Sequence, residues 1–287
     1  MDSEFHLQKL IEDENYYDTL PIELKSDEEF ILEAIKNNEL VFHSISDDLK
    51  QNRVFNFKCI EIDSCFLIFL PDYFKNDVDF NIEALDYNKN VIYSANDFIK
   101  NNKNFGLKAI EKSSHAYLQL SRKLQEDGEI FLKAAKKKNF AMWVYPKPLL
   151  EEDQEFMRKM IKIRGELISY TNSEFKNDFK NFELAILNNA SAYKCIREPL
   201  NSNKDLFLLA IQNYKYALFY ASNQIKSDFK LCSKSVSLWP ESYKDMSEKM
   251  KKNRIIATKA ALSKVKIEFI EFYPLENATF VNLLKNL

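Results

Sequence analysis

The sequence predicts an all-α fold, a right-handed or superhelical α-solenoid of about eleven two-helix repeats of 25 residues. Three observations predict it: an Asp or Asn recurs every 25 residues, apolar residues follow each one at helical spacing, and the 287 residues contain only three glycines. A sheet-rich protein of this length needs glycine in many tight turns. Because Gly106, Gly128 and Gly165 lie far apart, glycine-rich phosphate loops, dinucleotide fingerprints and nucleophile elbows are excluded as well.

Each repeat begins at the recurring Asp or Asn, called the anchor below, and positions within a repeat are given as offsets from it. Every step between anchors is 25 residues, except one of 26. The anchors are Asp2, Asp27, Asn52, Asp77, Asn102, Asp127, Asp153, Asp178, Asn203, Asp228 and Asn253. Since no linker interrupts this series, we predict a single continuous helical-repeat domain over residues 1–287.

The first helix of each repeat, helix A, is expected to start directly after the anchor, whose side-chain oxygen can accept backbone N–H groups of the first turn. Apolar residues at offsets 3, 4, 7 and 8 form one helical face. A small residue dominates offset 7, which allows helices to cross closely. Helix A should end at offsets 10 to 12, where several repeats carry residues that tolerate a left-handed closing conformation: Asn38, Asn88, Asn139, Gly165 and Asn189.

A second, shorter apolar pattern at offsets 14, 15 and 18 predicts helix B, as in Val41, Phe42 and Ile45. Six of the seven prolines lie at offsets 19 to 21, and they mark the end of helix B because proline disrupts a helix interior. The segment before the next anchor, such as 222–228, is expected to form a one-turn helical connector with a serine cap. Helices this short are marginal alone, so the repeats must stack on one another.

Two units, DLFLLAIQNYKYALFYASNQIKSD (205–228) and DEEFILEAIKNNELVFHSISDDL (27–49), resemble the repeat of the domain of unknown function 4116 family. The resemblance covers most of the chain. It implies tandem short helical repeats of a kind found in bacterial and protist proteins, some of them exported by pathogens. The family carries no catalytic residues and no assigned activity, so the resemblance implies none here.

Catalytic, metal and cofactor sites are not predicted, and the chain is not expected to be an enzyme. His6, His43 and His115 occupy different offsets, so stacking does not bring them together. The four cysteines show no CxxC spacing and are expected to be buried free thiols: Cys59, Cys65, Cys195 and Cys232.

The candidate partner-binding surface is the off-core row of helix B at offset 16, where six of ten residues are apolar or aromatic although a solvent-facing row should be polar. One interpretation is a groove that holds a protein or peptide partner through aromatic side chains. The alternative is that offset 16 packs against the adjacent repeat. The residues singled out for partner contact are His43, Tyr93, Trp143, Phe219 and Phe269.

Charge is unevenly distributed, although the whole chain has a net charge of −2 that argues against a nucleic-acid partner. Residues 1–51 contain fourteen Asp or Glu and four Lys, whereas residues 226–287 contain twelve basic and seven acidic residues. A basic patch for an acidic partner or phosphate is expected at Lys136, Lys137, Lys138, Lys251, Lys252 and Arg254. The alternative is a solvated outer face of helix A.

The leading hypothesis is therefore a non-enzymatic protein-protein interaction scaffold, either an exported pathogen protein or an inhibitor or immunity protein. Two alternatives remain: nucleic-acid or phosphate binding by the basic C-terminal half, and an enzyme with a site in the solenoid groove. No apolar run is long enough for a membrane span, and the first residues are acidic, unlike a secretory signal. The expected location is the cytoplasm, with export independent of a signal peptide as the alternative. The partner and the oligomeric state stay open.

Overall fold

The computed structural model describes residues 3–137, 139–140 and 147–262. Every regular element in these ranges is helical, which confirms the all-α prediction. The chain divides into two compact units, Met1–Pro146 and Lys147–Leu287, and each is described by itself. None of the described helices combines the length and hydropathy that a membrane span requires.

Helix A is the longest element of each repeat and starts one residue after the anchor, as predicted. In the first unit these helices are α1 (Ser3–Glu12), α3 (Glu28–Asn37), α6 (Arg53–Ile62), α9 (Val78–Tyr87), α12 (Lys103–Lys112) and α14 (Gly128–Ala135). In the second unit they are α16 (Gln154–Ile163), α18 (Phe179–Asn188), α19 (Lys204–Ala210), α22 (Phe229–Leu238) and α24 (Arg254–Leu262).

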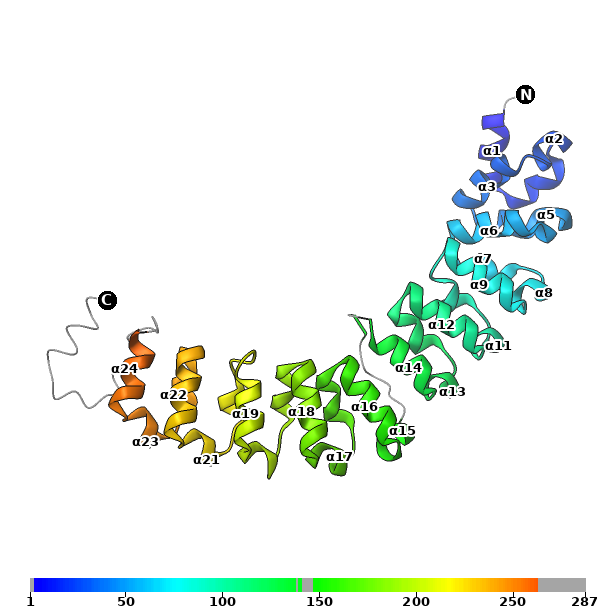
Figure 1. Cartoon of the computed structure of the whole chain (residues 1–287). Helices are drawn as coiled ribbons and strands as arrows, with labels where there is room; N and C mark the ends of the chain where they lie inside the picture. Colours follow the sequence, from blue (N-terminus) through cyan, green and yellow to red (C-terminus); the bar gives the residue numbers. More distant parts are fainter. Residues whose placement is uncertain (1–2, 138, 141–146, 263–287) are drawn as a thin grey trace. The chain divides into compact units, whose positions relative to one another are not determined.

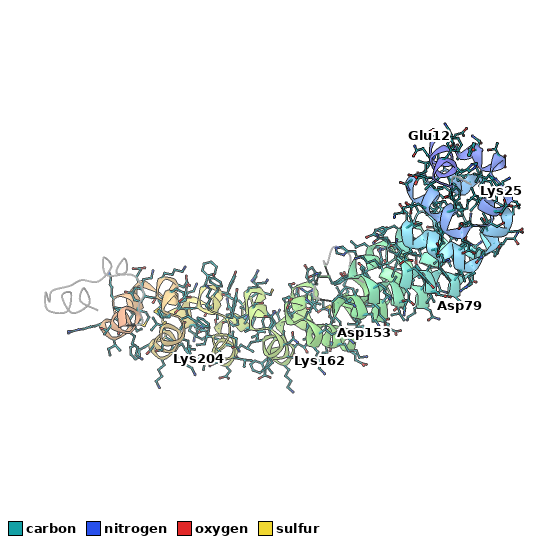
Figure 2. The ribbon with its side chains drawn as sticks, turned by 90° about the horizontal axis from the view of Figure 1, so that it is seen from above. Glu12, Lys25, Asp79, Asp153, Lys162 and Lys204 are labelled. Atoms are coloured by element: carbon teal, nitrogen blue, oxygen red, sulfur yellow. The ribbon has the colours of Figure 1, made fainter. Side chains whose placement is uncertain are left out.

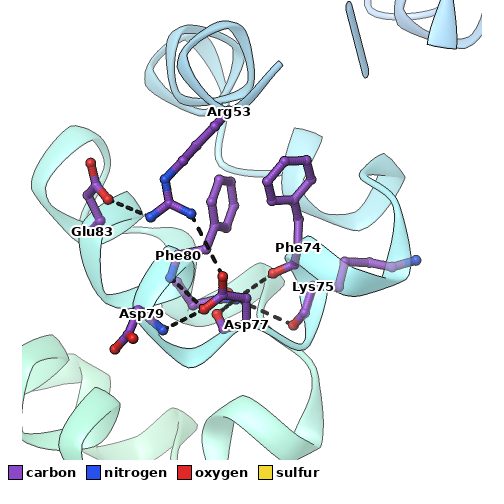
Figure 3. Close-up of polar contacts among 8 residues, drawn as sticks. Arg53, Phe74, Lys75, Asp77, Asp79, Phe80 and Glu83 are labelled. Carbon is purple, nitrogen blue, oxygen red and sulfur yellow. Dashed lines mark hydrogen bonds and ion pairs between the residues drawn. The ribbon is translucent and has the colours of Figure 1, made fainter. Parts of the chain in front are cut away.

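The anchor caps helix A in every repeat whose anchor lies among the described residues. Asp77, for example, accepts the backbone N–H groups of Asp79 and Phe80 at 2.9 and 3.0 Å (Figure 3). The same role is played by Asp27, Asn52, Asn102, Asp127, Asp153, Asp178, Asn203, Asp228 and Asn253. Each cap satisfies N–H groups that the first helical turn otherwise leaves without partners.

Helix B is a short helical segment, α-helical in some repeats and 3₁₀ in others. The α-helical ones are α4 (Val41–Ser44), α7 (Phe66–Phe69), α10 (Val91–Ser94) and α20 (Ala217–Tyr220). The 3₁₀ ones are η1 (Glu14–Thr19), η2 (Ser114–Gln119), η3 (Gly165–Tyr170), η4 (Ala190–Cys195) and η6 (Pro240–Asp245).

A short helical connector leads from helix B to the next anchor, so each repeat that the structure describes in full contains three helical segments. In the first unit the connectors are α2 (Ile22–Lys25), α5 (Asp47–Gln51), α8 (Asp72–Lys75), α11 (Asp97–Lys100) and α13 (Arg122–Gln125). In the second they are α15 (Lys147–Glu152), α17 (Ser173–Asn177), η5 (Leu200–Ser202), α21 (Asn223–Lys226) and α23 (Glu248–Lys251). Ser222 caps α21 by accepting the N–H of Ile225, as the sequence predicted, and Pro21 and Pro71 directly precede their connectors.

Within each unit the A helices pack in chain order. In the first unit, contacts run from α1 through α3, α6, α9 and α12 to α14. In the second, α16 packs on α18, α18 on α19, and α22 on α24. The connectors line one edge of each stack (Figure 1). Glu12, at the end of α1, and Lys25, in α2, lie on different edges of the first repeat (Figure 2).

The predicted left-handed closure of helix A is wrong. The backbone of Asn38, which follows α3, is extended, with φ −145° and ψ 104°, and no described glycine has a positive φ. The asparagine links repeats instead: its Nδ2 donates to the carbonyl of Ile11, in the preceding helix A, at 2.9 Å. Asn88 makes the same bond to Ile60 at 3.0 Å. The extended backbone lets the side chain bond to the neighbouring repeat, so no left-handed residue is required.

Two of the glycines lie where neighbouring atoms leave little or no room for a Cβ. A Cβ on Gly165, the first residue of η3, would overlap the carbonyl oxygen of Ala185 in the next repeat. A Cβ on Gly106, within α12, would lie 3.1 to 3.3 Å from side-chain atoms of Leu120 and Ile130. Gly165 therefore serves backbone contact between repeats, and Gly106 serves side-chain packing.

Candidate interaction surface

The offset-16 residues lie on the exposed side of helix B. Ile68, Tyr93 and Phe219 are 52%, 51% and 57% exposed. His43 is exposed as well, and its ring contacts Phe69 in the next helix B edge-on, with centroids 4.7 Å apart. Burial against the neighbouring repeat, the alternative interpretation of this row, therefore does not describe these side chains. Trp143 and Phe269 lie outside the described residues.

The exposure follows from the length of helix B. With only one turn, α10 turns Val91 and Ile92 into the core, where they are 0% and 1% exposed, and the next residue, Tyr93, must point outward. In most of the described repeats offsets 14 and 15 are buried, so offset 16 falls on the outer side, although Leu118 at this offset is half-buried. The fold therefore determines that this row is exposed, and the residue type at each position determines whether the row is apolar.

A lysine at offset 23 of the connector supports this row, and sequence reasoning missed it. In four repeats its Nζ donates to the backbone carbonyl at offset 16, which satisfies an unpaired carbonyl at the end of helix B. The pairs are Lys25 with Asp18, Lys50 with His43, Lys100 with Tyr93, and Lys226 with Phe219, at 2.8 to 3.2 Å. The recurrence of Lys at one offset was the available signal.

A shallow depression of about 330 Å³ adjoins the row in the first unit. It lies between two consecutive B helices and their connectors, and Ile68 lines it. The other lining residues are Leu67, Asp72, Lys75, Asn76, Ser94 and Asn96. Asn96 Nδ2 donates to Asn76 Oδ1 at 2.8 Å. The depression is therefore part apolar and part polar, with a size suited to a side chain of a partner rather than to a large cofactor.

The second unit carries an aromatic cluster around Phe219. The rings of Tyr214 and Tyr220 are stacked with centroids 6.2 Å apart, and Phe219 contacts Tyr220 edge-on at 5.0 Å. Lys215 lies over the ring of Tyr216, 4.9 Å from its centroid. Burial, with the neighbouring Tyr220, raises the pKa of Tyr214 to about 12. The sequence singled out Phe219 but not the three tyrosines around it.

The residues of the expected basic patch divide between the two units. Lys136 is exposed after α14, and Lys137 Nζ donates to the carbonyl of Glu111 at 2.8 Å. In the second unit, Lys251 pairs with Glu248 at 2.9 Å. Lys252 and Arg254 are exposed nearby, and Lys138 lies outside the described residues.

The outer face of helix A carries ion pairs between repeats. Lys58 pairs with Glu28 at 3.0 Å, and Lys112 pairs with Asp86 at 2.6 Å. The hydrogen bond from Lys112 lowers the pKa of Asp86. Such exposed pairs are individually weak, so they fix the register between repeats more than they stabilise the fold.

Two cysteines contradict the prediction of burial. Cys65 is exposed and Cys195 is half-buried, whereas Cys59 and Cys232 are buried. Burial raises the pKa of both Cys59 and Cys232 to about 12, which keeps these thiols neutral and unreactive. Among the described residues, no group of three or more His, Cys, Asp or Glu is arranged to hold a metal ion.

Comparison with known proteins gives one family. The sequence profile of the Domain of unknown function (DUF4116) matches four segments in tandem, residues 2–51, 153–201, 182–226 and 203–251. No curated protein and no solved structure matches the chain. The four matches begin at or near anchors, share the repeat described above and together cover just over half of the sequence, and the chain therefore belongs to the DUF4116 family.

Proposed function

We propose that this chain is a non-enzymatic scaffold that binds a protein or peptide partner along the exposed helix-B row. The observation that carries the proposal is the half-exposure of Ile68, Tyr93 and Phe219 at one repeat position. Residues at one offset on stacked helices are presented at regular intervals by a rigid backbone. Such a row suits an extended partner that places one apolar side chain per repeat.

The energetics favour binding through a few large apolar side chains over binding through a broad contact. Burying a large apolar side chain contributes roughly 1.5–3 kcal/mol. Ile68 and Tyr93 of consecutive repeats, with the depression beside Ile68, would supply most of the free energy of binding in the first unit. The polar rim of Asp72 and Lys75 would then select the partner's orientation.

The proposal includes a continuous right-handed or superhelical α-solenoid formed by all the repeats, acting in the cytoplasm. Its support is the anchor spacing, which continues from Asp127 to Asp153 with a single extra residue. Small-angle X-ray scattering tests the solenoid, since an elongated particle is expected and a compact one contradicts it. Fractionation of the native cell tests the location.

Binding is tested by capture with a matched pair of variants. The chain with Ile68→Ser and Tyr93→Ser should lose the partner that the wild type captures from its native cell. The control, Val54→Ser with Ile255→Ser, removes two apolar side chains of helix A that are at least as exposed, and this variant should retain the partner. Equal capture by both variants would show that the helix-B row is not the binding surface.

A further inference from the structure

Two consecutive connectors of the first unit expose an aromatic side chain that the fold does not require. Tyr73 in α8 and Phe98 in α11 are 56% and 63% exposed, and both occupy offset 21. In six other described connectors the residue at this offset is polar or charged: Glu23, Asp48, Lys123, Glu174, Gln224 and Lys249. Exposed rings on two adjacent repeats indicate a contact surface, because aromatic residues are enriched where proteins bind partners.

The residue that follows each of these connectors is an asparagine whose amide is held in place by the next repeat. Asn96 Nδ2 donates to Asn76 Oδ1 at 2.8 Å. In the same way, Ser121 Oγ donates to Asn101 Oδ1 at 2.7 Å. Because the carboxamide group is planar, fixing Oδ1 also fixes the direction of the two N–H groups on Nδ2. Asn76 and Asn101 are exposed, and neither Nδ2 has an acceptor among the described residues, so each connector ends in an oriented, unused donor.

The ring and the amide lie side by side on each connector. Tyr73 and Asn76 are three residues apart on one helical turn, which places both side chains on the same face. Phe98 and Asn101 repeat this arrangement, and we call the two sets the ring–amide pairs. The hydrogen bonds to the two asparagines link α8 to α11 and α11 to α13, so the pairs lie one repeat apart on a continuous edge (Figure 1). Asn76 also lines the depression beside Ile68, so the space next to its amide is open.

The spacing of the two donors favours one peptide conformation. Packed neighbouring helices lie about 8–10 Å apart, so donors one repeat apart are separated by about that distance. A polyproline II chain has three residues per turn and rises about 3.1 Å per residue, so every third carbonyl faces the same side at intervals of about 9.3 Å. These carbonyls are free, because this conformation makes no internal hydrogen bonds. A β-strand repeats its facing carbonyls at about 6.7 Å, and an α-helix uses its carbonyls internally, so neither matches.

We propose that the ring–amide pairs of α8 and α11 bind a proline-rich segment of a partner in the polyproline II conformation. The two amides donate to peptide carbonyls three residues apart, and each aromatic ring packs on a proline of the adjacent turn. Because proline has no N–H, a proline-rich backbone offers mainly acceptors, which the amide donors of this edge complement. The inference goes beyond the proposed function, since no residue of the ring–amide pairs belongs to the helix-B row.

The charges along the edge fit a segment that is uncharged in its centre. The helices α8 and α11 each carry one Asp and one Lys, so the central part has no net charge. On one side, α5 begins with the exposed Asp47 and Asp48. On the other side, α13 begins with the exposed Arg122 and Lys123, of which Arg122 pairs with Glu126. A segment with a basic end toward α5 and an acidic end toward α13 complements this edge. The three repeat steps from α5 to α13 cover about 24–30 Å, and ten residues of polyproline II span about 31 Å.

Isothermal titration calorimetry of the full chain with decaproline, acetylated and amidated so that its ends are uncharged, tests the site. We expect saturable binding at one site and none of a Gly-Ser peptide of the same length. Asn76→Asp with Asn101→Asp keeps each oxygen for its bond to the next repeat and removes only the free N–H groups, so the affinity should fall about tenfold or more. The control, Asn90→Asp with Asn104→Asp, adds the same charge to exposed asparagines outside the connectors of the same unit and should bind as the wild type does.

The aromatic rings are tested by a second pair of variants. Tyr73→Ser with Phe98→Ser should also weaken decaproline binding about tenfold or more, because aromatic side chains contribute strongly at such contacts. Val54→Ser with Ile62→Ser removes two exposed apolar side chains of α6 and should leave the affinity unchanged. Circular dichroism should show the same helix content in all four double variants, since every substituted side chain is exposed.

Two further readouts locate the bound segment. The side-chain NH₂ signals of Asn76 and Asn101 should shift in nuclear magnetic resonance spectra as decaproline is added. A proline peptide with a lysine at one end and an aspartate at the other should bind more tightly than decaproline at low ionic strength and lose this gain at about 1 M salt. Absence of saturable binding, equal binding of the Gly-Ser peptide, or equal weakening in an edge variant and its control would overturn the inference. Binding that is lost in Ile68→Ser with Tyr93→Ser but kept in the asparagine variant would overturn it too, while leaving the helix-B row as the binding surface.

Discussion

Arg53, the first residue of α6, reaches across to Asp77, the residue that caps α9 in the next repeat, with Nη1 and Oδ2 3.7 Å apart. Its other terminal nitrogen pairs with Glu83 at 2.6 Å (Figure 3). Its guanidinium also lies over the rings of Phe57 and Phe80. The Asp77 carboxylate thus has two roles, because it caps one helix and holds the first residue of the preceding one.

The same pairing recurs wherever a basic first residue precedes an Asp anchor. Lys103 pairs with Asp127 at 2.9 Å, and Lys204 pairs with Asp228 at 2.7 Å. At Asn52 the donor and the acceptor exchange places. The first residue of the preceding helix A is Glu28, and Asn52 Nδ2 donates to its carboxylate at 3.1 Å. In these four repeats the first residue of helix A is therefore matched to the next anchor, one repeat away.

Removing the Asp77 side chain should destabilise the first unit. Asp77→Ala removes the cap of α9 and leaves Arg53 with one carboxylate partner, so we expect a loss of about 1–2 kcal/mol. Asp77→Asn keeps an oxygen for the cap and should cost less than half as much. Urea unfolding followed by circular dichroism measures both. Equal losses in the two variants would mean that the charge of Asp77, rather than its capping hydrogen bonds, accounts for the loss of stability.

Acid should weaken the pairing at Asp228. The hydrogen bond from Lys204 lowers the pKa of Asp228 in the folded chain below its unfolded value. The unfolded state therefore binds the proton first, so the pair stabilises the fold above the unfolded pKa of about 3.9 and stops doing so as pH falls through the lower folded value. We expect wild-type stability to fall more than that of Lys204→Gln between about pH 5 and pH 3. Parallel pH profiles of the two proteins would contradict this.

The inter-repeat asparagine predicts one stabilising substitution. Asp63 occupies the offset of Asn38 and Asn88, and its Oδ1 accepts the N–H of Cys65, but a carboxylate cannot donate to the preceding repeat. Asp63→Asn should add that bond and stabilise the fold by about 0.5–1.5 kcal/mol. The reverse change, Asn88→Asp, removes the bond to Ile60 and should destabilise by a similar amount. The shift of the urea-unfolding midpoint shows whether each variant is more or less stable than the wild type.

Features that depend on neighbouring residues in sequence could be predicted from the sequence. The anchor caps its helix three residues on, as Asp27 does for Phe30, and Pro71 precedes its connector, so offsets alone located both. Contacts between repeats could not be predicted in this way. The bond from Asn38 to Ile11 spans 27 residues, and it replaced the left-handed closure that the local pattern indicated.

The candidate surface shows the same limit. The offset of the exposed row was predictable, because offsets 14 and 15 are apolar in most repeats and offset 16 comes next. The residues that surround this row could not be predicted. The depression beside Ile68 depends on which residues two adjacent repeats bring together, and the Tyr214 cluster depends on how the rings of one repeat pack on one another.

The two packed glycines should respond differently to alanine. In Gly165→Ala the added methyl meets the backbone carbonyl of Ala185, which cannot move without shifting the next helix A, so we expect a loss of more than about 2 kcal/mol. In Gly106→Ala the methyl meets only the tips of Leu120 and Ile130. Those side chains can shift, and the higher helix propensity of alanine contributes about 1 kcal/mol in return, so the net change should be small. Chemical denaturation of both variants tests the contrast. A larger loss at Gly106 than at Gly165 would show that the side-chain packing around Gly106 is stiffer than the backbone contact at Gly165.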